Sequence, residues 1–175
     1  MLKAHINKHT IVIILIVGVV IGGGIFFAFK KLILKPKVHY HGGFIVFQNN
    51  RKIDFSDIKY MYTKPCTVNG KEDEEHENPQ LEKAHLHNNV GDLVHVEARG
   101  ATWKDLFTNI NFPIDEKITT GYIGEKIIPS FLNLPIQPND SLVVFIGSND
   151  PVHLKEAVTK EYITEMAKKS TTCGD

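Results

Sequence analysis

The spacing of apolar and polar residues predicts short strands in the part of the chain that follows residue 37. Residues 38–47 are largely apolar and aromatic, the polar run 48–52 is typical of a turn, and residues 53–55 begin a return strand. Apolar and polar residues alternate again through residues 83–100, on both sides of a short turn-like segment. The apolar run 142–146 predicts a further, buried strand.

Helical signals follow the alternating segment. Thr102 is a suitable N-cap, and Asp105 stands three residues later, where a capping box needs a carboxylate. The apolar residues that recur at helical spacing after this cap are Trp103, Leu106, Phe107 and Ile110. The pattern therefore predicts a short amphipathic helix.

A second helix is predicted over residues 148–170. Asp150 can cap it, Pro151 fits its first position, and Lys168 and Lys169 suit the negative end of the helix dipole. The resulting order of elements is β-β-loop-β-β-α-β-α. That order predicts an α+β domain with a mainly antiparallel sheet, a short helix and a C-terminal helix.

The residues before this domain have a different pattern. Residues 11–29 carry no charge, and a helix of that length spans roughly the 30 Å hydrocarbon core of a bilayer. A cleaved signal peptide is the competing interpretation, but Phe26, Phe27 and Phe29 occupy the region where a cleavage site needs small residues. We therefore expect an uncleaved, single-pass membrane anchor.

The chain then divides into four parts with one internal loop. These are an N-terminal tail at 1–10, a transmembrane anchor at 11–29, a basic linker at 30–37 and a soluble domain at 38–175, with an acidic loop at 69–80. More lysines follow the span than precede it, which favours a cytoplasmic domain by the positive-inside rule. The short tail is instead typical of a signal anchor, which places the domain outside.

The composition argues against some classes of function. The 175 residues include 20 basic and 20 acidic side chains, so the chain lacks the positive charge that drives nucleic-acid binding. Cys66 and Cys173 could form one disulfide in an oxidising compartment. A Cys-x-x-Cys motif is absent, which argues against thiol–disulfide exchange.

The candidate chemistry lies in three pairs of residues with one residue between the members of each pair. They are His39 with His41, His85 with His87, and His95 with Glu97. Residues i and i+2 of a strand point to the same face of the sheet, so each pair presents both side chains on one side.

A hairpin would bring two of these pairs together. A three-residue loop, Val90-Gly91-Asp92, would place His87 opposite His95 and His85 opposite Glu97. A slip of one residue would instead put the two pairs on opposite faces. The alternate residues, Leu86, Val94 and Val96, are apolar and are predicted to face the core. If the first strand joins the same sheet, its histidines extend the cluster.

Such a cluster is a candidate transition-metal site. Imidazole together with a carboxylate suits zinc or copper and is poor for calcium or magnesium. Six groups exceed one tetrahedral site, so either some residues only orient ligands or two ions bind. For a single His-x-His pair the simpler interpretation is a hydrogen-bonded structural pair; three pairs within about sixty residues favour metal.

Two enzyme alternatives remain. Residues 85–100 partly match the first cupin motif, with Asp92 and Gly100 in its later places, but no second cupin motif follows. A zinc hydrolase would need an open coordination position and a base, a role that Glu97 could take. Neither alternative is as well supported as a protein without catalytic activity.

Three segments, 39–61, 84–107 and 140–151, resemble a family of single-pass membrane proteins rich in His-x-His, from uncultured small-genome bacteria and archaea. Family members often have a third His-x-His where this chain has Glu97. Some bear a disulfide-isomerase label, which does not carry over because Cys-x-x-Cys is absent here. The resemblance implies an anchored, extracytoplasmic domain with a histidine-rich face, and it implies no particular activity.

The sequence thus predicts a membrane-anchored protein that binds zinc or copper. It would handle the metal outside the cytoplasm or serve as an accessory subunit, contacting lipid through its N-terminal helix and other subunits through its domain. The alternative is a structural or protein-interaction module without metal, in which the histidines are incidental. The six side chains should converge on a common point in the first case and scatter over the sheet in the second.

Overall fold

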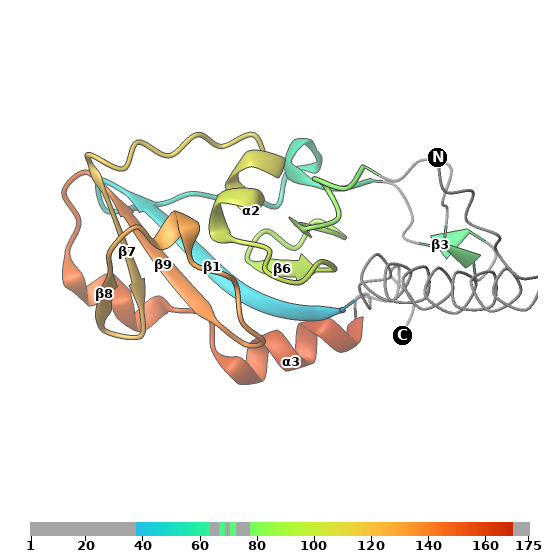
Figure 1. The fold of residues 1–175 in the computed structure, drawn as a ribbon. Helices are drawn as coiled ribbons and strands as arrows, with labels where there is room; N and C mark the ends of the chain where they lie inside the picture. The colour runs from blue at the N-terminus through green and yellow to red at the C-terminus, as the bar shows by residue number, and fades with distance from the viewer. Residues whose placement is uncertain (1–37, 64–66, 69–70, 73–77, 170–175) are drawn as a thin grey trace, which may run out of the picture. The chain divides into compact units, whose positions relative to one another are not determined.

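The computed structural model describes residues 38–63, 67–68, 71–72 and 78–169 (Figure 1). The predicted tail, anchor and linker, both cysteines and much of the predicted acidic loop lie outside these residues. Among the residues that are described, no helix is long and apolar enough to cross a membrane.

A seven-stranded sheet forms the centre of the domain, with the strand order β5-β6-β1-β9-β7-β8 and with β2 beside β1. The strands are β1 (Tyr40–Gln48), β2 (Arg51–Lys52), β5 (Ala84–His85), β6 (Leu93–Val96), β7 (Thr119–Ile123), β8 (Lys126–Ile128) and β9 (Ser141–Ile146). Two further short strands, β3 (Thr67–Val68) and β4 (Lys71–Glu72), pair only with each other. The pair β1–β9 is parallel and the other pairs are antiparallel, so the predicted α+β class with a mainly antiparallel sheet is confirmed.

Helices cover both faces of this sheet (Figure 1). On one face α2 (Trp103–Asn109) packs over apolar residues that include Phe44 and Val94. On the other face α3 (Lys160–Lys169) places Ile163 in a second, smaller apolar cluster with Leu93. Three 3-10 helices complete the description: η1 (Ile58–Tyr60), η3 (Phe131–Asn133) and η4 (Pro151–Glu156).

The predicted short helix is confirmed in detail. Thr102 caps α2 through its hydroxyl, which accepts a hydrogen bond from the backbone N–H of Asp105 at 3.3 Å. The Asp105 carboxylate in turn accepts from the backbone N–H of Thr102 at 2.9 Å, which completes the capping box. All four residues of the predicted apolar stripe are buried.

The predicted C-terminal helix is broken into two. Asp150 caps the 3-10 helix η4 as expected, with Pro151 at its start, but this helix ends at Glu156. Val158 then packs against the backbone of Gly43 in β1, and the hydroxyl of Thr159 accepts the backbone N–H of Tyr162 at 3.2 Å to begin α3. A β-branched residue anchored in the core and a new cap therefore interrupt what the sequence pattern presents as one helix.

The sequence pattern also missed one hairpin, β7–β8. Its two-residue turn begins at Gly124, whose positive φ of 61° is accessible to glycine at little cost. Most of β8 is exposed, including Ile127, so this strand lacks the regular alternation that marks a half-buried strand. By contrast, the predicted first hairpin is present, with Asn49 and Asn50 of its turn both at positive φ. Its return strand is β2, at residues 51–52 of the predicted turn, and the predicted strand at 53–55 does not form.

Candidate metal centre

Three histidines from three neighbouring strands form a row across the sheet. His85 of β5 pairs with His95 of β6, and His95 pairs with His41 of β1. Directly opposed residues of neighbouring strands have Cβ atoms about 5 Å apart and point to the same side. The assumption that the first strand joins the histidine hairpin in one sheet is therefore confirmed.

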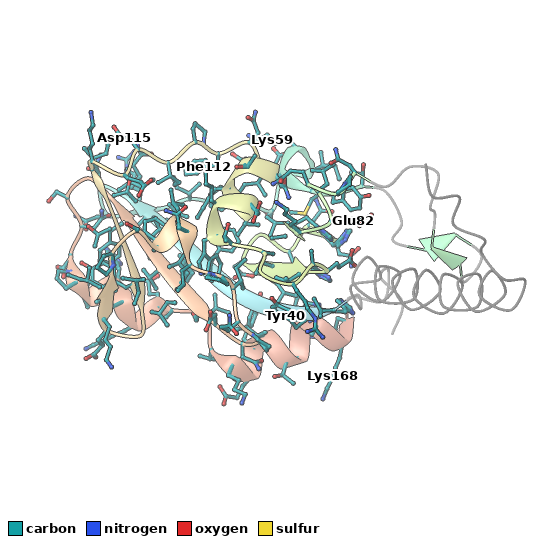
Figure 2. All side chains as sticks on the ribbon, viewed as in Figure 1. Tyr40, Lys59, Glu82, Phe112, Asp115 and Lys168 are labelled. Carbon is teal, nitrogen blue, oxygen red and sulfur yellow. The ribbon has the colours of Figure 1, made fainter. Side chains whose placement is uncertain are left out.

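Two more histidines lie beside the row, one at each end. His39 precedes His41 by two residues, and His87 follows His85 by two residues. The neighbours Leu86, Val94 and Val96 are fully buried in the apolar cluster under α2, as predicted. The histidines accordingly lie on the opposite side, the one that α3 covers further along β1. Figure 2 shows Tyr40, at the start of β1, and Lys168, at the end of α3, at the same end of the domain.

The predicted register of the histidine hairpin is wrong by two residues. His95 lies opposite His85, not opposite His87. The chain turns at Asn88 and Asn89, both at positive φ, and the backbone N–H of Val90 donates to the carbonyl of His87 at 3.0 Å. The connection between the strands is therefore longer than three residues. Because the shift is an even number of residues, every side chain keeps its predicted face.

The five imidazole rings are close enough to form two groups that share His95. Ligand atoms of His39, His41 and His95 lie within 4.8 Å of one another, and the same holds for His85, His87 and His95. Ring centroids are 4.3 Å apart for His41 and His95 and 4.8 Å apart for His87 and His95. We call the first set the outer group and the second the inner group.

The two groups differ in their access to solvent. His85, His87 and His95 are 2%, 4% and 1% exposed, so the inner group is buried throughout. In the outer group His39 is exposed and His41 is half-buried. The ring of Tyr62 lies beside the inner group, with its centroid 4.9 Å from that of His85 and 5.6 Å from that of His87.

Burial keeps the inner imidazoles neutral. Loss of solvent, together with the neighbouring histidines, lowers the pKa of His85 to about 3 and the pKa of His95 to about 2. Burial also lowers the pKa of His87. A neutral imidazole has one ring nitrogen with a free lone pair, which is the form that binds metal ions.

Hydrogen bonds to the backbone orient two of these rings. Nδ1 of His85 lies 2.7 Å from the carbonyl oxygen of Leu81, which can only accept, so Nδ1 carries the proton and donates it. This assigns the lone pair of His85 to Nε2, an atom that is buried and has no hydrogen-bond partner among the described residues. The ring of His87 bonds to the backbone of Tyr62. Metal-binding histidines commonly donate their second ring nitrogen in this way.

The other predicted ligand lies outside both groups. Glu97 is half-buried, and its carboxylate belongs to neither set of converging atoms. Its role as a ligand or as an orienting residue stays a prediction. His153 is separate from the cluster; its ring stacks on Phe47 and pairs with the carboxylate of Glu156 at 2.6 Å.

Sequence reasoning did not find the residues that surround the inner group. Tyr62 comes from a segment whose residue pattern indicates neither a strand nor a helix, and Leu81 acts through its backbone carbonyl, which no side-chain pattern can indicate. Tyr62 is brought there by pairing of the chain beside it, since its N–H donates to the carbonyl of Leu86 at 2.8 Å.

Comparison with known proteins gives no relative for this chain. No protein-family model matches it, and neither a curated protein nor a solved structure does. The histidine groups are therefore the main feature of the described residues that indicates a function.

Proposed function

We propose that this protein is a membrane-anchored, extracytoplasmic transition-metal-binding protein that holds or delivers zinc or copper. One observation carries the proposal: five imidazoles, in or beside three neighbouring strands, gather in two groups that share His95, and three of the five are buried. Convergence is the feature that distinguishes a metal site from incidental histidines, which have no reason to gather.

The energetics of burial support the proposal. A polar atom removed from water costs free energy unless it finds a partner in the protein. Nε2 of His85 is buried without a hydrogen-bond partner among the described residues, while Nδ1 of the same ring is used to orient it. A metal ion bound at Nε2 would supply the missing partner and would offset the cost.

The ligand set favours a transition metal such as zinc or copper over magnesium or calcium. Only imidazoles are in the two groups, and imidazole nitrogens suit zinc, copper, nickel and iron better than magnesium or calcium. A tetrahedral zinc ion with bonds of about 2.0–2.1 Å holds its ligand atoms roughly 3.4 Å apart. Atoms that now lie within 4.8 Å would close by on the order of 1 Å, a movement that side-chain rotation can supply.

The cellular setting rests on the N-terminal sequence. Residues 11–29 would anchor the protein in the membrane, and residues 30–37 would join the anchor to the sheet. The first histidine of the outer group, His39, follows that linker after one residue. An anchored metal-binding domain of this kind could act alone or as an accessory subunit of a membrane complex.

The test is the metal content of the full-length protein, purified in detergent without a histidine tag. Mass spectrometry should find close to one zinc or copper ion per chain after incubation with either metal and gel filtration. The variant His85→Ala/His87→Ala should lose most of this metal, because two of three inner ligands are gone. The matched control is His153→Ala, which removes a histidine outside both groups.

Two outcomes would decide against the proposal. Wild-type protein that retains neither metal would leave an anchored structural or interaction module as the function. Metal retained equally by all three proteins would mean that it is bound elsewhere.

A metal-dependent hydrolase is the second candidate, and one feature favours it. Three imidazoles leave a fourth zinc position for water, and His85 also lines a cavity of about 200 Å³ with Tyr60, Met61 and Asn109. No carboxylate belongs to the converging groups of the described residues, so a general base is not placed. Hydrolysis of p-nitrophenyl acetate by the zinc-loaded protein, lost in His85→Ala/His87→Ala, would support this candidate. The cupin-like alternative does not fit, because the main sheet is one open sheet with helices on both faces.

A further inference from the structure

The two histidine groups differ in burial, and they share one residue. His95 contributes a ligand atom to both, so it lies between an outer group that meets solvent and an inner group that does not. We infer that the groups act in sequence: a metal ion enters at His39 and His41 and passes across His95 to His85 and His87, where it is held. This inference rests on the proposed function and adds a route for loading and release.

The geometry favours transfer without release of the ion. A bare divalent ion in a desolvated interior is very costly, so an ion that moves inward must keep protein ligands at each step. The ring centroid of His95 lies 4.3 Å from that of His41 and 4.8 Å from that of His87. An ion that stays bound to His95 can therefore exchange an outer imidazole for an inner one over a short distance.

The two ends of this route are built differently, which gives it a direction. The inner rings of His85 and His87 are oriented by the backbone at Leu81 and Tyr62, so little freedom is lost when they bind metal. The outer group includes the exposed ring of His39, where water competes for the ion. The inner group should hold the ion more tightly, and the outer group should exchange it faster.

A shared ligand also limits the stoichiometry. If each ion uses the same ligand atom of His95, the two groups cannot be filled together. We therefore expect one ion per chain at saturation, located at the inner group. The outer group would be occupied only during loading and release.

The experiment measures both equilibrium and rate on the full-length protein in detergent, with zinc as the probe. Zinc release to the chromogenic chelator 4-(2-pyridylazo)resorcinol is followed by stopped flow, and loading is followed by the reverse mixing. The variant His39→Ala/His41→Ala should still bind one zinc per chain but load and release it at least about tenfold more slowly. His153→Ala is the matched control and should behave as wild type.

Each alternative result has a distinct meaning. Unchanged rates in the outer variant would overturn the inference, as would loss of zinc equal to that of His85→Ala/His87→Ala, because the five histidines would then form one site. Two zinc ions held by the wild type at saturation would also overturn it. Wild type that binds no zinc or copper would instead refute the proposed function itself.

One competing route can be tested separately. The cavity beside His85 includes Tyr62 in its lining and could admit an ion from the other side of the inner group. Met61→Ala, which enlarges the same cavity, should leave the loading rate within about twofold of wild type if ions enter through His39 and His41. A large acceleration in this variant, with no effect of the outer substitutions, would place the entrance at the cavity instead. The single variant His39→Ala, at an exposed position, guards against misfolding of the double variant.

Discussion

His85 and His95 are titratable residues buried in a domain that gives them no carboxylate in either converging group. Their neutral form is the one compatible with the fold, since burial holds both pKa values far below the ordinary value of 6.5. These candidate metal ligands therefore also make the stability of the metal-free protein depend on pH.

The first prediction concerns this dependence on pH. At pH 7.5 and above both histidines are almost entirely neutral in the folded and unfolded chains, so they add little pH dependence. Below pH 6.5 His85 and His95 are protonated in the unfolded chain. In the folded chain they stay neutral until the pH falls to about 3 for His85 and about 2 for His95. The free energy of unfolding of the metal-free domain is therefore greatest above pH 6.5 and decreases as the pH falls. Each histidine should lower the folding equilibrium constant by up to about tenfold per pH unit.

Urea unfolding of the full chain between pH 7.5 and 4.5, with a chelator present, measures this loss. The stability of His95→Leu should be less sensitive to pH than that of the wild type, because one buried titrating group is gone. Equal stability of the wild type at pH 6.5 and pH 5 would contradict the prediction.

Sequence reasoning could assign the histidines to a face but could not fix their partners. In any regular strand, residues two apart point to the same face of the sheet. The sequence therefore predicts the shared face of His85, His87 and His95 correctly, even though the predicted register is wrong by two residues. The register itself depends on where the chain turns. Two asparagines at positive φ provide that turn at Asn88 and Asn89, and the glycine at Gly91 is a competing turn signal nearby.

At the scale of elements, the histidine-bearing strand β1 is positioned by its contact with the segment before α3. Gly43 lies on the same face as His41, two residues along the strand, and the side chain of Val158 occupies the space above it. A Cβ atom added at Gly43 would lie 2.6 Å from Cβ of Val158, which is closer than side-chain atoms pack. A glycine is therefore needed here for close approach and not for its backbone freedom.

The second prediction follows from this contact. Gly43→Ala should destabilise the domain by about 1–3 kcal/mol, because the new methyl group overpacks a close contact. Val158→Ala should restore part of the loss, so that the double variant is more stable than the sum of the two single effects predicts. Chemical denaturation of all three variants gives the coupling energy.

The neighbouring glycine supplies the control. A Cβ at Gly42 would meet its nearest atoms at 3.2–3.3 Å, which calls for a shift of only a few tenths of an ångström. Gly42→Ala should therefore cost less than Gly43→Ala and should show no coupling to Val158. Coupling of the same size at both positions would show that the contact with Val158 is not the cause.

The elements that sequence reasoning missed depend on contacts of this kind. The break between η4 and α3 comes from the docking of Val158 on a strand more than a hundred residues earlier. The hairpin β7–β8 is stabilised by its pairing with β9 and not by a regular apolar pattern of its own. The capping box of α2, by contrast, is a local device of residues Thr102–Asp105, and it was predictable for that reason.

At the scale of the whole molecule, the candidate metal centre joins parts of the chain that are far apart in sequence. It connects β1, in the middle of the sheet, through β6 to β5, which is two residues long and has no further strand beyond it in the described sheet. A short edge strand with few paired residues is the kind of element that opens locally before the domain unfolds. An ion held by His85 and His95 would fasten this edge to its neighbour.

The last prediction is that zinc stabilises the domain, and most strongly at this edge. A ligand that binds only the folded state at about 100 times its Kd adds about 2.7 kcal/mol, which should raise the Tm by about 5–10 °C for a domain of this size. Amide hydrogen exchange of residues 84–87 should slow more than that of β9, since zinc ligands flank the backbone of β5 and not that of β9. The His85→Ala/His87→Ala variant should show neither change, and His153→Ala should show both. If zinc raised the Tm of His85→Ala/His87→Ala as much as that of the wild type, the stabilising ion would have to bind elsewhere, and the histidine groups would not be the metal centre.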